Sequence, residues 1–306
     1  MRVESLTIRS YKSFFEEITI PFSPRLNVFI GPNNCGKTNV LNAIDFLTHP
    51  EKDPLRLHHH RSDLALLVHL DADEQKAFSG VNGLALRGKQ YAVACTDRNG
   101  RTVSADLSHY VMNRIKMLHY DDFGDLEQIG RDYSMLAEKH PAVFQRLTRL
   151  LQTYFPEVKS IERLVDEEAE RFGTVMMEQG SITIERLGGG FRRVLVILIY
   201  ALHPDYSVLM IDEPEIHLHP GMIKKLLRVL ISSATNQIIV TSHSPLFVTA
   251  ATLHQVYRVL KDEQGSHIYS LALGTLSIDK HRLVQELNAD NLEMFFADKI
   301  LLVEGV

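Results

Sequence analysis

Residues Leu26–Asn39 read LNVFIGPNNCGKTN and are followed by the apolar, helix-like run Val40–Leu47. The stretch joins an apolar strand, a glycine-bounded loop and the start of a helix. The loop matches G-x-x-x-x-G-K-[ST] at every fixed position, which is the pattern of a phosphate-binding loop (P-loop). An ordinary glycine-rich turn is the alternative, and the flanking strand and helix argue against it.

Each fixed position of this loop has a chemical task. Gly31 and Gly36 allow the backbone to curl so that its N–H groups point inward at a phosphate chain. The helix that begins near Lys37 adds the positive end of its dipole. Lys37 is expected to reach the β- and γ-phosphates, and the Thr38 hydroxyl to hold Mg²⁺. The stretch therefore predicts a nucleotide site.

The composition is that of an ordinary globular protein. The chain has 306 residues, 45% hydrophobic and 23% charged, with a formal net charge of −5. Cys35 and Cys95 cannot form a disulfide framework, and no apolar run approaches the ~20 residues of a membrane span. The N-terminus begins with strand-like sequence rather than a signal peptide. We therefore expect a cytoplasmic protein without a membrane partner, in which any nucleic-acid contact comes from local basic groups.

Hydrophobic patterning divides the chain into strand-rich and helix-rich parts. Three strands are predicted before the loop, and four more after it. A helical segment follows from about Leu107 to Phe155, and Pro156 ends its last helix. The predicted strands are Val3–Ile8, Glu17–Ile20, Leu26–Ile30, Leu64–Leu70, Gly83–Arg87, Tyr91–Thr96 and Arg101–Ala105, the last two joined by a tight turn at Asp97–Gly100.

Three later motifs carry further chemistry. Leu187–Arg193 (LGGGFRR) places three glycines at a helix start, which is either an anion-binding nest or a flexible turn. The apolar strand before Asp212 and Glu213 ends in two carboxylates. Asp212 is placed to hold Mg²⁺ and Glu213 to polarise a water, the alternative being a polar turn. Another apolar strand delivers His243 at its carboxyl end, where ligands of parallel sheets bind. A lone histidine is more often structural, but the position of His243 at this edge favours a functional role.

The ordered set GPNNCGKTN, LGGGFRR, VLMIDEPEIHLHP and TSHSP resembles the Walker A, signature, Walker B with D-loop, and switch-histidine elements of an ABC-type ATPase. The opening Leu6–Phe14 resembles the first strand of RecF- and SMC-like ATPases. Within that group the chain is most similar to the OLD family (overcoming lysogenization defect) and its Gabija-type relatives, which join such an ATPase to a C-terminal TOPRIM nuclease.

This resemblance implies an α/β fold, an ABC-type P-loop ATPase head with a mixed central sheet, an antiparallel β subdomain and a compact helical insert. Residues 1–106 and 171–290 would form the two parts of the head. Residues 107–170 would form the helical insert, expected to serve as a dimerisation element. Residues 291–306 would begin an incomplete TOPRIM-like domain, either cut from or naturally broken before the nuclease. In that domain Glu304 would bind metal only if a complete TOPRIM domain follows.

The resemblance also assigns the site and its cofactors, ATP and Mg²⁺. Two heads would pair, each signature loop closing over the ATP of the other. Glu213, Lys37 and His243 would be catalytic, and Thr38 and Asp212 would hold Mg²⁺. ATP would contact Asn33, Asn34, Cys35, Gly36, Lys37, Thr38 and Asn39, and in trans Leu187, Gly188, Gly189 and Gly190.

One departure concerns the signature, where Gly188 stands at the position of a serine, so that trans-activation is expected to be weak. The Q-loop glutamine has two candidates, Gln75 and Gln90, with no motif behind either.

The resemblance implies a slow ATPase that gates a DNA nuclease in anti-phage defence. Its expected partners are a homodimer or higher oligomer, DNA and an accessory defence protein. Two alternatives stay open: a RecF-type repair ATPase without nuclease activity, and a scaffold or sensor locked by ATP. The basic groups available for DNA are interpreted first as solvated helix faces. They are Arg192-Arg193, Lys224-Lys225-Arg228 and Arg146/Arg149.

Overall fold

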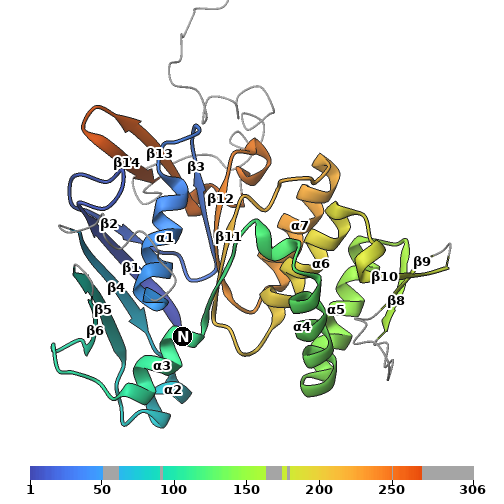
Figure 1. Cartoon of the computed structure of the whole chain (residues 1–306), viewed down its shortest axis with the longest axis horizontal. Helices are drawn as coiled ribbons and strands as arrows, with labels where there is room; N and C mark the ends of the chain where they lie inside the picture. The colour runs from blue at the N-terminus through green and yellow to red at the C-terminus, as the bar shows by residue number, and fades with distance from the viewer. Residues whose placement is uncertain (51–61, 90–91, 163–173, 178–179, 250, 271–306) are drawn as a thin grey trace, which may run out of the picture.

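The computed structural model describes residues 1–50, 62–89, 92–162, 174–177, 180–249 and 251–270 (Figure 1). The predicted domain start at 291–306, with Glu304, lies outside the described residues, as does Gln90. Among the described residues, no helix combines the length and the hydropathy that a membrane crossing requires.

A six-stranded sheet forms the centre of the molecule, in the order β14-β13-β3-β12-β11-β7. Its neighbours pair in parallel except β13 and β14, which form an antiparallel hairpin. Every residue of β3 and β12 is buried, as expected for parallel strands covered on both faces. The strands are β3 (Leu26–Ile30), β7 (Ile115–Leu118), β11 (Val208–Asp212), β12 (Gln237–Ser242), β13 (Val256–Asp262) and β14 (Gly265–Ser270).

A second sheet is antiparallel and has the order β2-β1-β4-β5-β6. Helix α1 (Lys37–Thr48) lies between the two sheets (Figure 1). Its apolar residues share one core with Phe29 of β3 and with the inward-facing residues Leu6 and Ile8 of the antiparallel sheet. The strands are β1 (Arg2–Arg9), β2 (Ile18–Pro21), β4 (Asp63–His69), β5 (Gly83–Lys89) and β6 (Ala92–Asp97), and two short helices, α2 (Ala72–Ala77) and α3 (Ala105–Asn113), flank them.

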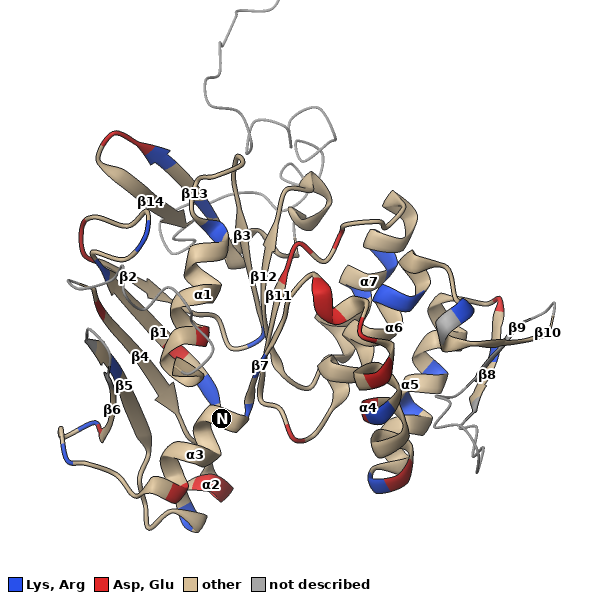
Figure 2. Cartoon of the chain, in the orientation of Figure 1, with Lys and Arg blue, Asp and Glu red and all other residues tan. Residues whose placement is uncertain are grey.

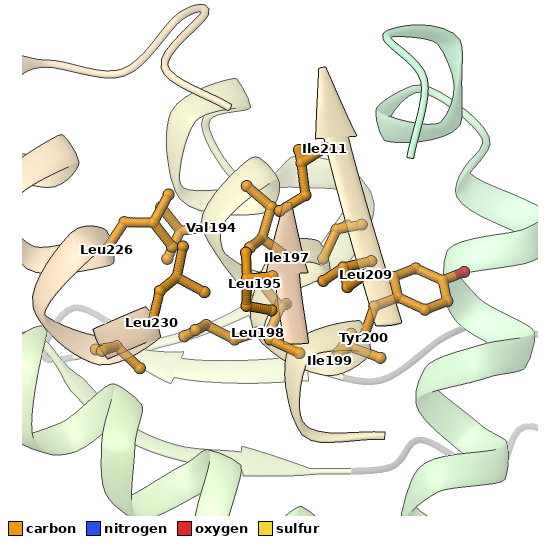
Figure 3. Packing of buried hydrophobic residues seen from close by; sticks show 14 of the residues in the cluster. Val194, Leu195, Ile197, Leu198, Ile199, Tyr200, Leu209, Ile211, Leu226 and Leu230 are labelled. Atoms are coloured by element: carbon orange, nitrogen blue, oxygen red, sulfur yellow. The ribbon is translucent and has the colours of Figure 1, made fainter. Parts of the chain in front are cut away.

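The other face of the central sheet is covered by helices. Along β11 the residues alternate between the two cores: Val208 and Met210 face α1, whereas Leu209 and Ile211 face the helices. Helix α6 is buried from Arg193 to Leu202, and Figure 3 shows its apolar side chains packed between β11 and α7. The helices are α4 (Leu126–Lys139), α5 (Pro141–Tyr154), α6 (Gly189–Leu202) and α7 (Pro220–Ser233), with a small sheet of β8 (Val158–Glu162), β9 (Thr174–Met177) and β10 (Gly180–Thr183) beside them.

The structure confirms the α/β head fold with its mixed central sheet and antiparallel subdomain, and it differs from the predicted elements in two places. The predicted strand Arg101–Ala105 is reduced to one bridge, between Thr96 and Thr102. The side chain of Ser104 instead accepts a hydrogen bond from the Leu107 N–H and caps α3. In addition, the segment 107–170 is not wholly helical, because Ile115–Leu118 forms the edge strand β7 of the central sheet and Val158–Glu162 forms β8 of the small sheet.

The side chain of Gln237 links the central sheet to the N-terminal strand. Its Nε2 donates to the carbonyls of Val3 (3.0 Å) and Ser23 (2.8 Å), and its Oε1 accepts from the Val3 N–H (2.8 Å). The residue is 3% exposed.

Truncation of Gln237 would leave three buried backbone groups without partners. We expect Gln237→Ala to lower the free energy of unfolding by about 2–4 kcal/mol, measured by urea denaturation. Gln145→Ala, on the exposed face of α5, is the control and should change it by less than about 0.5 kcal/mol. Equal decreases in the two variants would contradict this role.

Candidate nucleotide-binding site

Three parallel strands end side by side at one edge of the central sheet. The pairing places Asp212 opposite Thr241, and Ser242 opposite Ile30. The loop after β3, the carboxylates after β11 and the histidine after β12 therefore meet at the carboxyl ends of the strands. Ligands of open α/β sheets bind at such an edge.

The loop after β3 adopts a conformation that only glycine allows at two positions. Gly36 has φ 108°, and a Cβ there would lie 2.5–2.6 Å from the hydroxyls of Ser13 and Ser266. At Gly31 a Cβ would lie 2.1 Å from the carbonyl oxygen of Val259. The loop is thus enclosed by β13 and β14 on one side and by the turn after β1 on the other. Helix α1 begins directly after Gly36, so its N-terminus faces the pocket.

Lys37 is 4% exposed and its ammonium lies inside the loop. Nζ donates to the carbonyls of Gly31 (3.0 Å) and Pro32 (2.8 Å) and lies 3.5 Å from Nδ1 of His243. Burial lowers the pKa of Lys37, and the Cys35 thiol and the carboxylates of Glu213 and Asp212 partly oppose this shift.

Thr38 and Asp212 are in direct contact. Thr38 Oγ1 donates to Asp212 Oδ1 at 3.0 Å, and the Thr241 hydroxyl donates to the same oxygen. A hydroxyl and a carboxylate at one point are oxygen donors suited to Mg²⁺, which takes few protein ligands and completes its shell with phosphate and water. Within the described ranges no group of three or more His, Cys, Asp or Glu residues could hold a metal ion.

Glu213 and His243 form a pair at 3.0 Å, from Oε1 to Nε2. Glu213 has φ 48°, an unusual value for a residue with a side chain, and its N–H donates to the carbonyl and hydroxyl of Thr241, both at 3.2 Å. An ammonium only donates and a carboxylate only accepts. A neutral imidazole that carries its proton on Nε2 therefore satisfies both Lys37 and Glu213.

Two side chains that sequence reasoning did not place in the site hold this edge together. Glu215 Oε1 accepts from the Ser242 hydroxyl (2.7 Å) and from the His243 N–H (2.6 Å). Arg193, counted among the basic groups on a helix face, is instead 3% exposed. Its guanidinium donates to the carbonyls of Glu213 (2.7 Å) and Pro214 (3.1 Å) and stacks on the Phe123 ring at 3.8 Å. Arg193 therefore supports the structure of the site and is not available at the surface to bind DNA.

These groups surround a pocket of about 600 Å³, within the range of small-molecule sites. Lys261 and Ser13 belong to its lining and were missed by motif analysis. Lys261 is far along the chain and becomes a neighbour only because β13 pairs with β3. The pocket is lined by Ser13, Asn33, Asn34, Gly36, Lys37, Thr38, Asn39, Glu213, His243 and Lys261.

Cys35 and the predicted signature residues lie outside this lining. The Cys35 side chain is 3% exposed, and burial raises the pKa of its thiol. Leu187 is buried, whereas Gly188 and Gly189 are exposed at the N-terminus of α6, where a Cβ on either glycine would meet no described atom within 4 Å. A Cβ on Gly190 would lie 2.9 Å from the His217 carbonyl oxygen. The three glycines thus lie outside the lining of the pocket of their own chain.

Known proteins resemble this chain in sequence or in fold. The chain is 22% identical to the OLD nuclease of Thermus scotoductus, across 99% of this chain and 71% of that protein. It is 35% identical to the DNA replication and repair protein RecF of Streptococcus agalactiae over 92 residues, 26% of this chain and 25% of RecF. A crystal structure of an SMC head bound to the C-winged-helix domain of ScpA matches with a TM-score of 0.69 at 16% identity, over 90% of this chain and 98% of that one.

The fold is therefore that of an ABC-type P-loop ATPase head, and the chain is related in sequence to OLD nuclease and RecF. One family model spans the loop after β3, both carboxylates and the histidine, since it matches residues 26–249. The chain belongs to this family, described as "AAA domain, putative AbiEii toxin, Type IV TA system".

Proposed function

We propose that the chain is the ATPase portion of an OLD-family DNA nuclease, which binds and hydrolyses ATP between two heads to gate an attached TOPRIM domain in anti-phage defence. The convergence of Lys37, Thr38, Glu213 and His243 on one pocket, with Asp212 bound to Thr38 beside it, carries the ATPase assignment. The alignment with OLD nuclease along nearly the whole chain supports the family assignment. A cytoplasmic location accords with this function, and residues 291–306, with Glu304, would begin the nuclease.

Binding follows from the loop and the helix behind it. The N–H groups of residues 33–39 and the α1 dipole attract the phosphates. The Lys37 ammonium exchanges its loop carbonyls for phosphate oxygens, a stronger pair because both partners are charged. Lys261 adds a second cation from β13. Thr38 and Asp212 are the residues that would hold Mg²⁺, which would supply charge neutralisation at the phosphates.

Hydrolysis requires a base beside the terminal phosphate. Glu213 is the carboxylate suited to this role, because Asp212 is engaged by two hydroxyls. Its Oε1 accepts the Nε2 proton of His243, so the imidazole fixes the carboxylate and lies between it and Lys37. In this role Glu213 orients and polarises the attacking water, and His243, held between Glu213 and Lys37, is placed to sense the γ-phosphate.

The second catalytic surface comes from another copy. Gly188, Gly189 and Gly190 begin α6 and lie outside the lining of their own pocket, so their N–H groups can approach the ATP of a paired head. Gly188 offers no hydroxyl, an observation that favours slow turnover. It also makes an ATP-locked scaffold the second candidate function.

The assignment of Glu213 is tested by Glu213→Gln, which removes the charge and keeps the shape. Turnover should fall about 10²–10⁴-fold because the general base is lost. ATP affinity should stay near that of the wild type, and paired heads should accumulate with ATP. Phosphate release and analytical ultracentrifugation measure these outcomes.

Two further variants serve as references for the Glu213→Gln experiment, one without ATP binding and one with wild-type behaviour. Lys37→Ala should lose ATP binding, and Glu263→Gln, on the exposed turn after β13, should behave as wild type. Turnover by Glu213→Gln at the wild-type rate would show the base assignment to be wrong. ATP binding by the wild type without turnover would favour the scaffold.

The role of Lys261 is tested by Lys261→Met. Removal of one charge-assisted hydrogen bond to the polyphosphate should raise the Kd for ATP about tenfold. At saturating ATP the turnover should change little, because Lys261 is not part of the Glu213–His243 pair. Fluorescent-nucleotide titration gives the Kd. Lys261→Arg should retain most of the affinity, and Lys76→Met, on α2, is the control. An unchanged Kd in Lys261→Met would place Lys261 outside the nucleotide contacts.

A further inference from the structure

Helices α5 and α7 share an unusual composition. Of the 306 residues of the chain, 38 are acidic, yet neither helix contains an aspartate or glutamate. Their sequences are PAVFQRLTRLLQTY and PGMIKKLLRVLISS. Their basic residues form what we call the basic strip: Arg146, Arg149, Lys224, Lys225 and Arg228 (Figure 2).

Two contacts bring these helices side by side although they lie far apart in the chain. Arg146 Nη2, near the start of α5, donates to the carbonyl of Ser233 at the end of α7 (2.5 Å). Lys225, near the start of α7, places Nζ 4.9 Å from the ring centroid of Phe155, which caps the end of α5. The helices therefore run antiparallel, and the basic residues of both belong to one surface.

The strip faces solvent. Arg146, Arg149, Lys224 and Arg228 are exposed, whereas Leu147 and Leu151 of α5 and the apolar positions of α7 are buried in the core. Lys224 and Arg228 are one helical turn apart, about 6 Å along the axis. Positive charges thus recur on both helices with no acidic residue of either helix between them.

The strip leads into a polar hollow of about 630 Å³ at its Arg146 end. Arg2 and Arg114 also line this hollow, with Asp71 as the acidic member of its lining. Ser207 and Gln237, which line it too, lie at the amino ends of β11 and β12. The hollow is therefore at the opposite edge of the sheet from the nucleotide pocket.

We propose that the basic strip binds the phosphate backbone of a DNA duplex. The charge of the strip is opposite to that of the chain as a whole, which is −5, so a polyanion is attracted locally. Rows of lysine and arginine on helices that contain no acidic residue suit the closely spaced charges of a duplex and predict binding without sequence preference. The strip extends the proposed function, since a gate for a DNA nuclease must contact DNA, and the binding itself needs no ATP turnover.

The test is fluorescence anisotropy of a labelled DNA duplex with the 306-residue chain over a series of salt concentrations. The strip variant is Arg149→Gln/Lys224→Gln/Arg228→Gln. Its Kd should rise roughly tenfold or more, and the salt slope should fall by about 0.9 for each phosphate that the variant no longer neutralises. The matched control, Lys76→Gln/Arg87→Gln/Arg101→Gln, changes the net charge equally on the antiparallel side of the molecule and should bind as wild type.

Thermal unfolding and fluorescent-ATP binding of both triple variants separate this proposal from the ATPase function. Reduced DNA binding in the strip variant with intact folding and ATP binding supports the proposal.

Equal DNA affinity in the strip variant and the wild type overturns the proposal and leaves the ATPase function standing. Equally weakened binding in the strip variant and the control also overturns it, because the effect would then be one of net charge. Binding of poly-L-glutamate but not of the duplex overturns it in favour of an acidic protein partner. DNA binding through the strip by a chain that neither binds nor hydrolyses ATP supports the strip and refutes the proposed function.

Discussion

The hydrogen bond from Thr38 Oγ1 to the Asp212 carboxylate joins the start of α1 to the end of β11. Thr38 lies in the first turn of α1, the helix between the two sheets. Asp212 ends β11, and one strand, β12, lies between β11 and the P-loop strand β3. The Thr241 hydroxyl donates to the same carboxylate from the strand between them. This junction requires the register in which Asp212 lies opposite Thr241 and Ser242 opposite Ile30. A slip of one residue would turn every side chain of β12 to the other face and disperse the site.

Much of this arrangement could be predicted from the sequence because its signals are local. The loop at Gly31–Thr38 carries its chemistry within eight residues, and the strands that deliver Asp212 and His243 are continuous apolar runs. Such runs are typical of buried parallel strands, whose carboxyl ends meet at one edge. The prediction of a strand at Arg101–Ala105 was wrong for an equally local reason, since Ser104 caps the next helix instead of extending a hairpin.

The residues that sequence reasoning missed depend on the order of the strands. Lys261 enters the pocket because β13 pairs with β3, and no motif at position 261 indicates this pairing. Arg193 resembles a surface cation beside Arg192, but its helix is buried on all sides, and its guanidinium is satisfied by backbone carbonyls and an aromatic ring. For a buried charge such partners are required, since burial without them costs several kcal/mol. The all-apolar run after Arg193 was the one local sign of its burial.

The position of Arg193 also constrains how the site can move. The helix that begins with Gly188–Gly190 carries Arg193 one turn later, and Arg193 binds the carbonyl of Glu213. Glu213 is held at φ 48° by the backbone and hydroxyl of Thr241, while Glu215 holds the His243 N–H. A displacement of the start of α6 is therefore resisted by the same contacts that orient Glu213 and His243. A second chain that contacted Gly188–Gly190 would therefore touch the helix whose Arg193 holds the backbone of Glu213.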